Sequence, residues 1–152
     1  RLGERPAWRG VGDGLEMEID PADAMDREFY LGTYDPWLLL VLRDVVRAGD
    51  HALDLGAHKG YVTLRMAKQV GAGGRVFAFE PDPRARACLE AHCHRNRLTQ
   101  VSCFPYALAD EPGERTLALS MQLGWSSFFP NELARPAVTE RKRCLHSTAP
   151  PW

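Results

Sequence analysis

The sequence predicts an α/β protein built on the first half of a doubly wound parallel sheet. The apolar run His51–Leu55 ends in a turn with two glycines, and an amphipathic pattern follows at once, in which Val62, Met66 and Val70 recur every four residues. A second apolar run at 75–80 leads into a second helical pattern. Strands that alternate with helices in this way form parallel sheets, and ligands bind at the carboxyl ends of the strands.

The turn after the first strand contains Gly56 and Gly60 in the spacing Asp-x-Gly-x-x-x-Gly. Gly56 has access to backbone conformations that are closed to other residues, and it lets a ligand lie against the main chain. Gly60, at the entrance of the helix, leaves N–H groups facing an anionic ligand group. The spacing differs from that of dinucleotide and nucleoside-triphosphate loops. Asp54 would repel a phosphate but attract an ammonium group.

A second acidic residue, Glu80, ends the next strand, 24 positions after Gly56. In such folds a carboxylate at this place accepts hydrogen bonds from the ribose diol of the ligand. A ligand with a carboxylate, an ammonium group and a ribose therefore suits both acids, and S-adenosylmethionine is such a ligand. The alternative is an ordinary strand–turn–helix unit with a solvated glutamate, which the position of Glu80 disfavours.

The stretch from Asp54 to Pro83 resembles the first half of an FkbM-type S-adenosylmethionine-dependent methyltransferase domain. In that family a strand ending Asp-x-Gly-Ala-x-x-Gly is followed by a helix, a Gly-Gly turn and a strand ending Phe-Glu-Pro-x-Pro. The resemblance extends from about Met17 to about Ser127. It implies a Rossmann-like class I methyltransferase fold, of which this chain supplies the 3-2-1 half. It also implies O-methylation of a small molecule or sugar acceptor.

The candidate cofactor-binding residues come from the two strand ends and from the loop after the third strand. That loop lies beside the adenine in such folds. The resemblance favours this contact over edge packing, because the family has a similar Ala-Leu-x-Asp there. The candidates are Asp54, Gly56, Ala57, His58, Lys59, Gly60, Glu80, Pro81, Asp82, Ala107 and Leu108.

The second half of the fold, which normally walls the acceptor site, has no counterpart in this sequence. Relatives continue into a strand carrying Ile-Lys-Ile-Asp-x-Glu-Gly, and nothing after Thr139 matches it. No catalytic residue is therefore assigned, and geometry alone disfavours His58 as a general base. The first strand keeps an open edge, which predicts a homodimer or aggregation unless the strand at Leu15–Ile19 covers that edge. Two alternatives stay open: an NAD- or nucleotide-binding half-domain, and a non-catalytic interaction fragment.

Composition allows one packed domain, since 45% of the 152 residues are hydrophobic and 26% are charged. A net charge of −1 gives no field that would attract nucleic acid or an anionic membrane. The longest apolar run, Trp37–Leu42, is too short to span a bilayer, and no secretory signal is visible, so we expect a cytoplasmic protein. The cysteines and histidines between 88 and 94 form no compact ligand set, so no metal is expected.

The flanking segments divide the chain into an arm and short strand (1–33), a cofactor-binding half-domain (34–130) and an irregular tail (131–152). Residues 1–16 look like a loose arm before a strand at Leu15–Ile19. Asp35 and Pro36 predict the start of an apolar helix that Gly49 closes.

After Glu80, Asp82 and Pro83 predict the start of a helix that runs to about Asn96. A third strand is expected at Val101–Leu108, on the sheet edge because Pro105 has no N–H. A weak strand follows at Thr116–Ser120, then a loop with aromatic residues at 124–129. Beyond Asn131 no order is expected, and the basic run at 141–143 reads as solvated.

Overall fold

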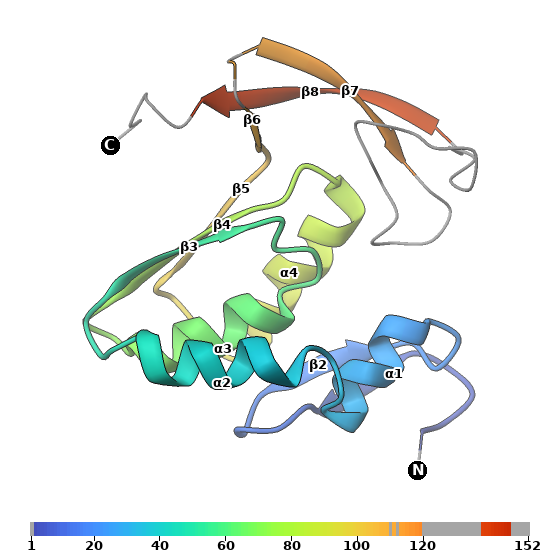
Figure 1. Ribbon diagram of the computed structural model, residues 1–152. Helices are drawn as coiled ribbons and strands as arrows, with labels where there is room; N and C mark the ends of the chain where they lie inside the picture. The colour runs from blue at the N-terminus through green and yellow to red at the C-terminus, as the bar shows by residue number, and fades with distance from the viewer. Residues whose placement is uncertain (1, 110, 112, 120–137, 147–152) are drawn as a thin grey trace.

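The computed structural model of the chain describes residues 2–109, 111, 113–119 and 138–146 (Figure 1). At its centre is a parallel sheet of β3 (His51–Leu55), β4 (Arg75–Phe79) and β5 (Val101–Phe104), in the order β3-β4-β5. The register places Leu53 beside Phe77. This is the predicted 3-2-1 half of a Rossmann-like fold, and that prediction is confirmed.

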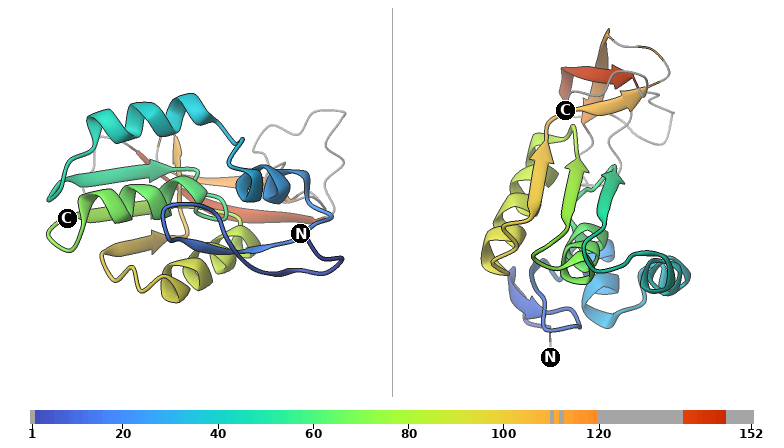
Figure 2. Two further views of the ribbon diagram at one scale, coloured as in Figure 1. Left: turned by 90° about the horizontal axis from the view of Figure 1, so that it is seen from below. Right: turned by 90° about the vertical axis from the view of Figure 1, so that its left-hand side faces the viewer.

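Two helices cover one face of this sheet (Figure 2). Helix α3 (Tyr61–Val70) packs its Met66 and Val70 against Val76 of β4. Helix α4 (Pro83–Arg95) packs its Leu89 against Ala78 of β4. Helix α3 follows from its apolar spacing and α4 from its capping residues, so the strand–helix alternation read from the sequence gives the observed layers.

The predicted helix starts agree with the structure. Asp82 caps α4 by accepting the N–H of Arg84 at 2.9 Å. Asp35 caps α2 (Pro36–Val45) by accepting the N–H of Leu38 at 3.1 Å. The predicted end of α2 at Gly49 is wrong, because Val46 already adopts an extended conformation.

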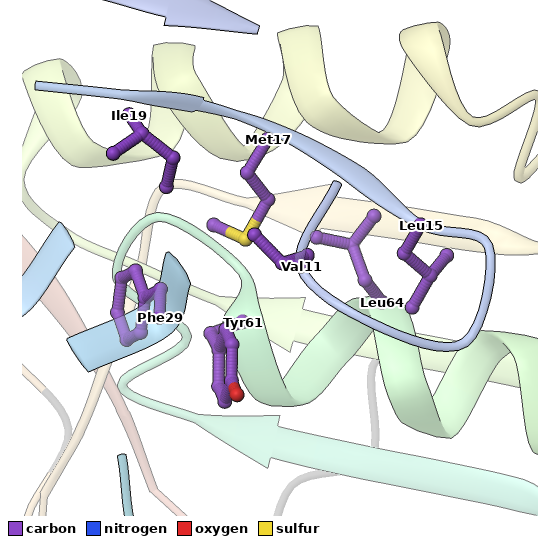
Figure 3. Close-up of a cluster of buried hydrophobic side chains, with 7 residues drawn as sticks. All are labelled: Val11, Leu15, Met17, Ile19, Phe29, Tyr61 and Leu64. Atoms are coloured by element: carbon purple, nitrogen blue, oxygen red, sulfur yellow. The ribbon is translucent and has the colours of Figure 1, made fainter. Parts of the chain in front are cut away.

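The N-terminal segment is an ordered module, and the prediction of a loose arm is wrong. Strand β1 (Ala7–Gly10) pairs antiparallel with β2 (Glu16–Ile19), and α1 (Ala24–Leu31) follows. The sequence reasoning missed β1 and α1. Figure 3 shows why they fold: the hairpin and α1 bury one apolar cluster against the first turns of α3. The cluster consists of Val11, Leu15, Met17, Ile19, Phe29, Tyr61 and Leu64.

A second sheet lies beyond the carboxyl ends of the parallel strands (Figures 1 and 2). It contains β6 (Ala107–Ala109), β7 (Gly113–Leu119) and β8 (Val138–His146), in the order β6-β8-β7. The predicted strand at 101–108 is therefore broken at Pro105 and Tyr106, and its end joins the second sheet.

The second sheet also bears on the predictions for the C-terminal third. Strand β7 confirms the weak strand predicted at 116–120, although Ser120 lies outside the described residues. Strand β8 contradicts the expectation of no order beyond Asn131, and it contains the basic run 141–143. The predicted aromatic loop at 124–129 lies outside the described residues.

One side of the parallel sheet is open. Within the described part of the chain, β4 is the only strand paired with β3. Leu53 and Leu55 point away from the face that α3 covers, and these residues are 54% and 56% exposed. Trp37 on α2 is 77% exposed. We call the free edge and exposed face of β3, together with the outer surface of α2, the open side.

The described helices are all short, and none is apolar over the length that a bilayer crossing requires.

Candidate functional site

The glycine turn between β3 and α3 is held in a conformation that needs its glycines. Gly56 and Gly60 have φ values of 84° and 92°, in the region that favours glycine, and His58 between them also has a positive φ of 50°. A Cβ atom at Gly60 would collide with the Leu89 side chain of α4, whereas nothing lies within 4 Å of a Cβ at Gly56. Gly60 thus allows the close approach of α4, and Gly56 leaves open space beside the main chain.

Glu80 links the glycine turn to the start of α4. Its carboxylate accepts the N–H of His58 and the N–H of Asp82, each at 2.8 Å. Burial raises the pKa of Glu80, and these two bonds oppose that rise. The structure therefore brings together the two strand ends that the sequence paired. An ionised carboxylate has about four acceptor positions, so Glu80 retains capacity for ligand hydroxyls.

Asp54 lies at the N-terminus of α3, where Gly60 provides no side-chain cap. Its carboxylate accepts the hydroxyl of the fully buried Thr63 at 2.5 Å. Burial raises the pKa of Asp54, and hydrogen bonds from the hydroxyl and the backbone of Thr63 oppose the rise. A carboxylate from β3 beside the first turn also suits the positive end of the helix dipole. Asp54 thus caps α3, and its contact with a ligand ammonium group stays a prediction.

A small cavity of about 50 Å³ lies beside the glycine turn. Three aromatic rings form one wall: Phe29 stacks on Tyr61 with centroids 4.4 Å apart, and Tyr34 meets both rings edge-on. The sequence reasoning missed these three residues, since only Tyr61 adjoins the glycine motif. The cavity is lined by Phe29, Tyr34, Asp54, Gly56, Ala57, His58, Tyr61 and Val62.

Two side chains of this cavity carry polar atoms without a partner. Both ring nitrogens of His58 and the hydroxyl of Tyr61 are buried and make no hydrogen bond within the described residues. Burial, reinforced by the nearby Lys59, lowers the pKa of His58 to about 4. The imidazole is therefore neutral near pH 7, with one donor and one acceptor nitrogen. Buried polar atoms without partners are rare, so they indicate a place where a ligand or water binds.

Lys59 points away from this cavity. Its Nζ lies 2.8 Å from Asp23 and 2.7 Å from Asp26, both on or beside α1. Burial by itself would lower the pKa of Lys59, but the two carboxylates outweigh it and raise the pKa. The side chain that the sequence assigned to the cofactor is therefore bonded to α1.

The remaining candidates lie outside the cavity. Ala107 and Leu108 belong to β6, where they pair with Cys144 and Leu145 of β8. Pro81 is half-buried between Glu80 and Asp82. The structure thus accounts for Ala107 and Leu108 by strand pairing, and their contact with an adenine stays a prediction.

Two other features of the molecule do not compete with the glycine turn as the site. A larger cavity of about 620 Å³ lies between α2 and α3, and it includes none of the predicted site residues. Within the described residues, no three His, Cys, Asp or Glu side chains are grouped so that they could hold a metal ion. His92 instead bonds to the backbone of Lys59 and Glu18. The glycine turn, at the carboxyl end of β3, remains the candidate site.

Comparison with solved structures identifies proteins that share the fold. TYW2 of M. jannaschii, in complex with AdoMet, matches with a TM-score of 0.53 and 20% identity, over 68% of this chain and 44% of that chain. TYW2 of P. horikoshii, in complex with MeSAdo, matches with a TM-score of 0.52 and 23% identity, over 74% of this chain and 40% of that chain. At these identities the matches show the shared fold.

Comparison with known sequences identifies the family of the chain. A demethylmenaquinone methyltransferase of Lactobacillus johnsonii is 39% identical over 59 residues, which cover 38% of this chain and 24% of the relative. The chain thus spans about a quarter of that relative and less than half of the two solved structures. The methyltransferase FkbM domain family matches residues 54–144, which confirms the resemblance read from the sequence. Because this match covers more than half of the chain, the chain belongs to the methyltransferase FkbM domain family.

Proposed function

We propose that this chain is the cofactor-binding part of a methyltransferase that uses S-adenosylmethionine. The observation that carries the proposal is the joining of the glycine turn to Glu80 through the N–H of His58, at the carboxyl ends of two adjacent parallel strands. Ligands of open α/β sheets bind at this place. Membership of the FkbM domain family supports the same reading.

The residues around the turn suit such a cofactor. Gly56 leaves open space beside the main chain, and the unpartnered polar atoms of His58 and Tyr61 lack hydrogen bonds that a polar ligand would supply. Glu80 would accept ribose hydroxyls through its free acceptor positions. When bound, S-adenosylmethionine supplies an activated methyl group. The glycine turn and Glu80 would hold and orient it.

For the acceptor we propose the hydroxyl of a small molecule or sugar. The protein's main contribution to such a transfer is the positioning of the two reactants, together with a base that takes the hydroxyl proton. His58 lines the cavity, but a pKa of about 4 makes its imidazole a weak base for this step. We therefore assign no catalytic residue, and we place the acceptor wall beyond the open side.

We also propose a cytoplasmic location and no nucleic-acid partner. The second proposal rests on the net charge of −1, which gives no field that would attract a polyanion.

A second candidate function is a non-catalytic module that binds another protein. The observation that favours it is the open side, where Leu53 and Leu55 are more than half exposed. An NAD-binding half-domain is disfavoured because three residues separate Gly56 from Gly60, and the dinucleotide loop has a different spacing.

Titration calorimetry tests the proposal. The chain is titrated with S-adenosylhomocysteine, the demethylated product, and separately with NAD. We expect heat with S-adenosylhomocysteine only. Heat with NAD alone would overturn the cofactor assignment, and heat with neither would favour the protein-binding module.

A further inference from the structure

The family match begins at residue 54, yet the cavity has a wall that comes from upstream of it. Phe29 belongs to α1, and Tyr34 lies in the turn between α1 and α2. Both line the cavity together with Gly56 and His58 of the glycine turn. The N-terminal module therefore contributes to the candidate site, although the matched region does not include it.

A buried ion cluster fastens α1 to the glycine turn. Asp23 caps α1 by accepting the N–H of Met25 at 2.9 Å, and its other oxygen binds Lys59. Asp26 is 2% exposed and accepts the N–H of Asp20 as well as Lys59. The first turn of α1 thus presents two carboxylates to one ammonium group of the glycine turn.

The same residue of the turn is held from a second direction. Nδ1 of His92, on α4, lies 2.7 Å from the carbonyl oxygen of Lys59, to which it donates. The Nε2 atom of His92 accepts the N–H of Glu18 on β2 at 3.0 Å. Lys59 is therefore bound through its backbone to α4 and through its side chain to α1, and His92 adds the link to β2.

Energetics favour a positioning role for this cluster. A buried ion pair contributes little to net stability compared with apolar residues of the same shape, because both charges lose their hydration. Removal of one partner is costly, since it leaves a buried charge unpaired. Without Lys59, Asp23 and Asp26 would repel each other beside the turn, and α1 would move away from it. The apolar cluster docks α1, and the ion cluster sets its position relative to the glycine turn.

We propose that α1 and Tyr34 form a wall of the cofactor site, and that Lys59 is a positioning residue that holds this wall against the glycine turn. The inference rests on the proposed cofactor function. It replaces the sequence-based expectation that Lys59 contacts the cofactor, and it extends the site upstream of the matched family region.

The test of the wall uses Tyr34→Leu, with Tyr30→Leu as the matched control. Tyr30 is also half-buried and packs on the same apolar cluster, but it does not line the cavity. Titration with S-adenosylhomocysteine should show about tenfold weaker binding for Tyr34→Leu and unchanged binding for Tyr30→Leu. Equal binding by both variants and the wild type would contradict the proposal that Tyr34 forms a wall of the cofactor site.

The test of Lys59 compares Lys59→Met with Lys59→Arg, which keeps the charge. Lys59→Met should weaken binding about tenfold and speed amide hydrogen exchange in both α1 and the turn at 56–60. Lys59→Arg should restore most of the protection and the affinity. If Lys59→Met does not fold, the double variant Lys59→Met with Asp26→Asn removes the unpaired buried charge and should show the same loss of affinity.

The outcomes separate this inference from the proposed function. A wild-type chain that binds no S-adenosylhomocysteine overturns the proposed function and the wall with it. A wild type that binds, while Lys59→Met or the double variant keeps full affinity and exchange protection, overturns the positioning role of Lys59 and leaves the proposed function intact.

Discussion

The turn at the carboxyl end of β3 and the free edge of the same strand differ sharply. At the turn, the two acids are paired: Asp54 with Thr63, and Glu80 with two backbone N–H groups. Along the edge, Leu53 and Leu55 are more than half exposed. Parallel sheets are normally covered on both faces. The chain thus contains what the cofactor turn needs, whereas the open side lacks a cover within the described residues.

The largest expected effect concerns the open side. We expect the 152-residue chain by itself to show little or no methyl transfer, because binding a donor without orienting the acceptor forgoes an effective molarity of about 10⁵–10⁸ M. A methyl-transfer assay against a panel of hydroxylated acceptors checks this. Robust turnover would contradict the view that the turn is complete and the open side is not, since the acceptor wall would then lie within the chain.

At the turn, His58 should make stability depend on pH. Its pKa is 6.5 in the unfolded chain and about 4 in the folded chain, where burial and Lys59 lower it and Asp23 and Asp82 oppose them. The unfolded chain therefore binds the proton more readily. The free energy of unfolding should fall as the pH drops from 6.5 towards 4, by at most about 3 kcal/mol.

Urea unfolding at a series of pH values measures this effect of His58. His58→Gln should flatten the decline, while the raised pKa values of Asp54, Asp26 and Glu80 affect both proteins alike. The same slope in both proteins would show that His58 is not buried as a neutral ring.

Glu80 should matter for the ligand itself. Glu80→Ala removes a charged acceptor from the site, which should weaken S-adenosylhomocysteine binding by about 1–3 kcal/mol. Glu90→Ala, at an exposed acid of α4, is the control and should bind as the wild type does. Calorimetry compares the two variants, and equal affinities would show that Glu80 does not bind the ligand.

The smallest effect on the folded chain should come from the open edge. We expect the chain to associate with a second copy through β3, because its unpaired backbone groups lie beside apolar side chains. Leu53→Lys should change the stability of the monomer by less than about 0.5 kcal/mol but abolish association. Light scattering across a concentration series measures it, with Leu31→Lys as the control, at an exposed apolar residue of α1 outside the open side. A wild type that stays monomeric at all concentrations would contradict the dimer.

The elements that sequence reasoning predicted are those with local signals. The strand before Gly56 and the helix after Gly60 follow from apolar spacing, and the start of α4 follows from Asp82 and Pro83. The order of the parallel strands follows from the alternation of strand and helix. These features depend on neighbours within a few residues, so a single sequence carries them.

The predictions that failed depend on distant contacts. Strand β1 has weak alternation, and it is ordered because it pairs with β2 and its Trp8 packs edge-on against His92 of α4. The strand predicted at 101–108 is divided at Pro105 because β8, from far along the chain, pairs with its second part. The residues of β1 and of the segment 101–108 do not by themselves show which distant elements will pack on them or pair with them.

Lys59 shows what the sequence determines and what only the tertiary structure decides. The sequence by itself determined that a lysine stands in a glycine turn at the end of a buried strand, with an acid at the end of the next one. Only the tertiary structure decided that this lysine faces Asp23 and Asp26. Their side chains meet because burial of the Phe29 cluster docks α1 beside the turn, and a buried ammonium group needs carboxylates within hydrogen-bond distance.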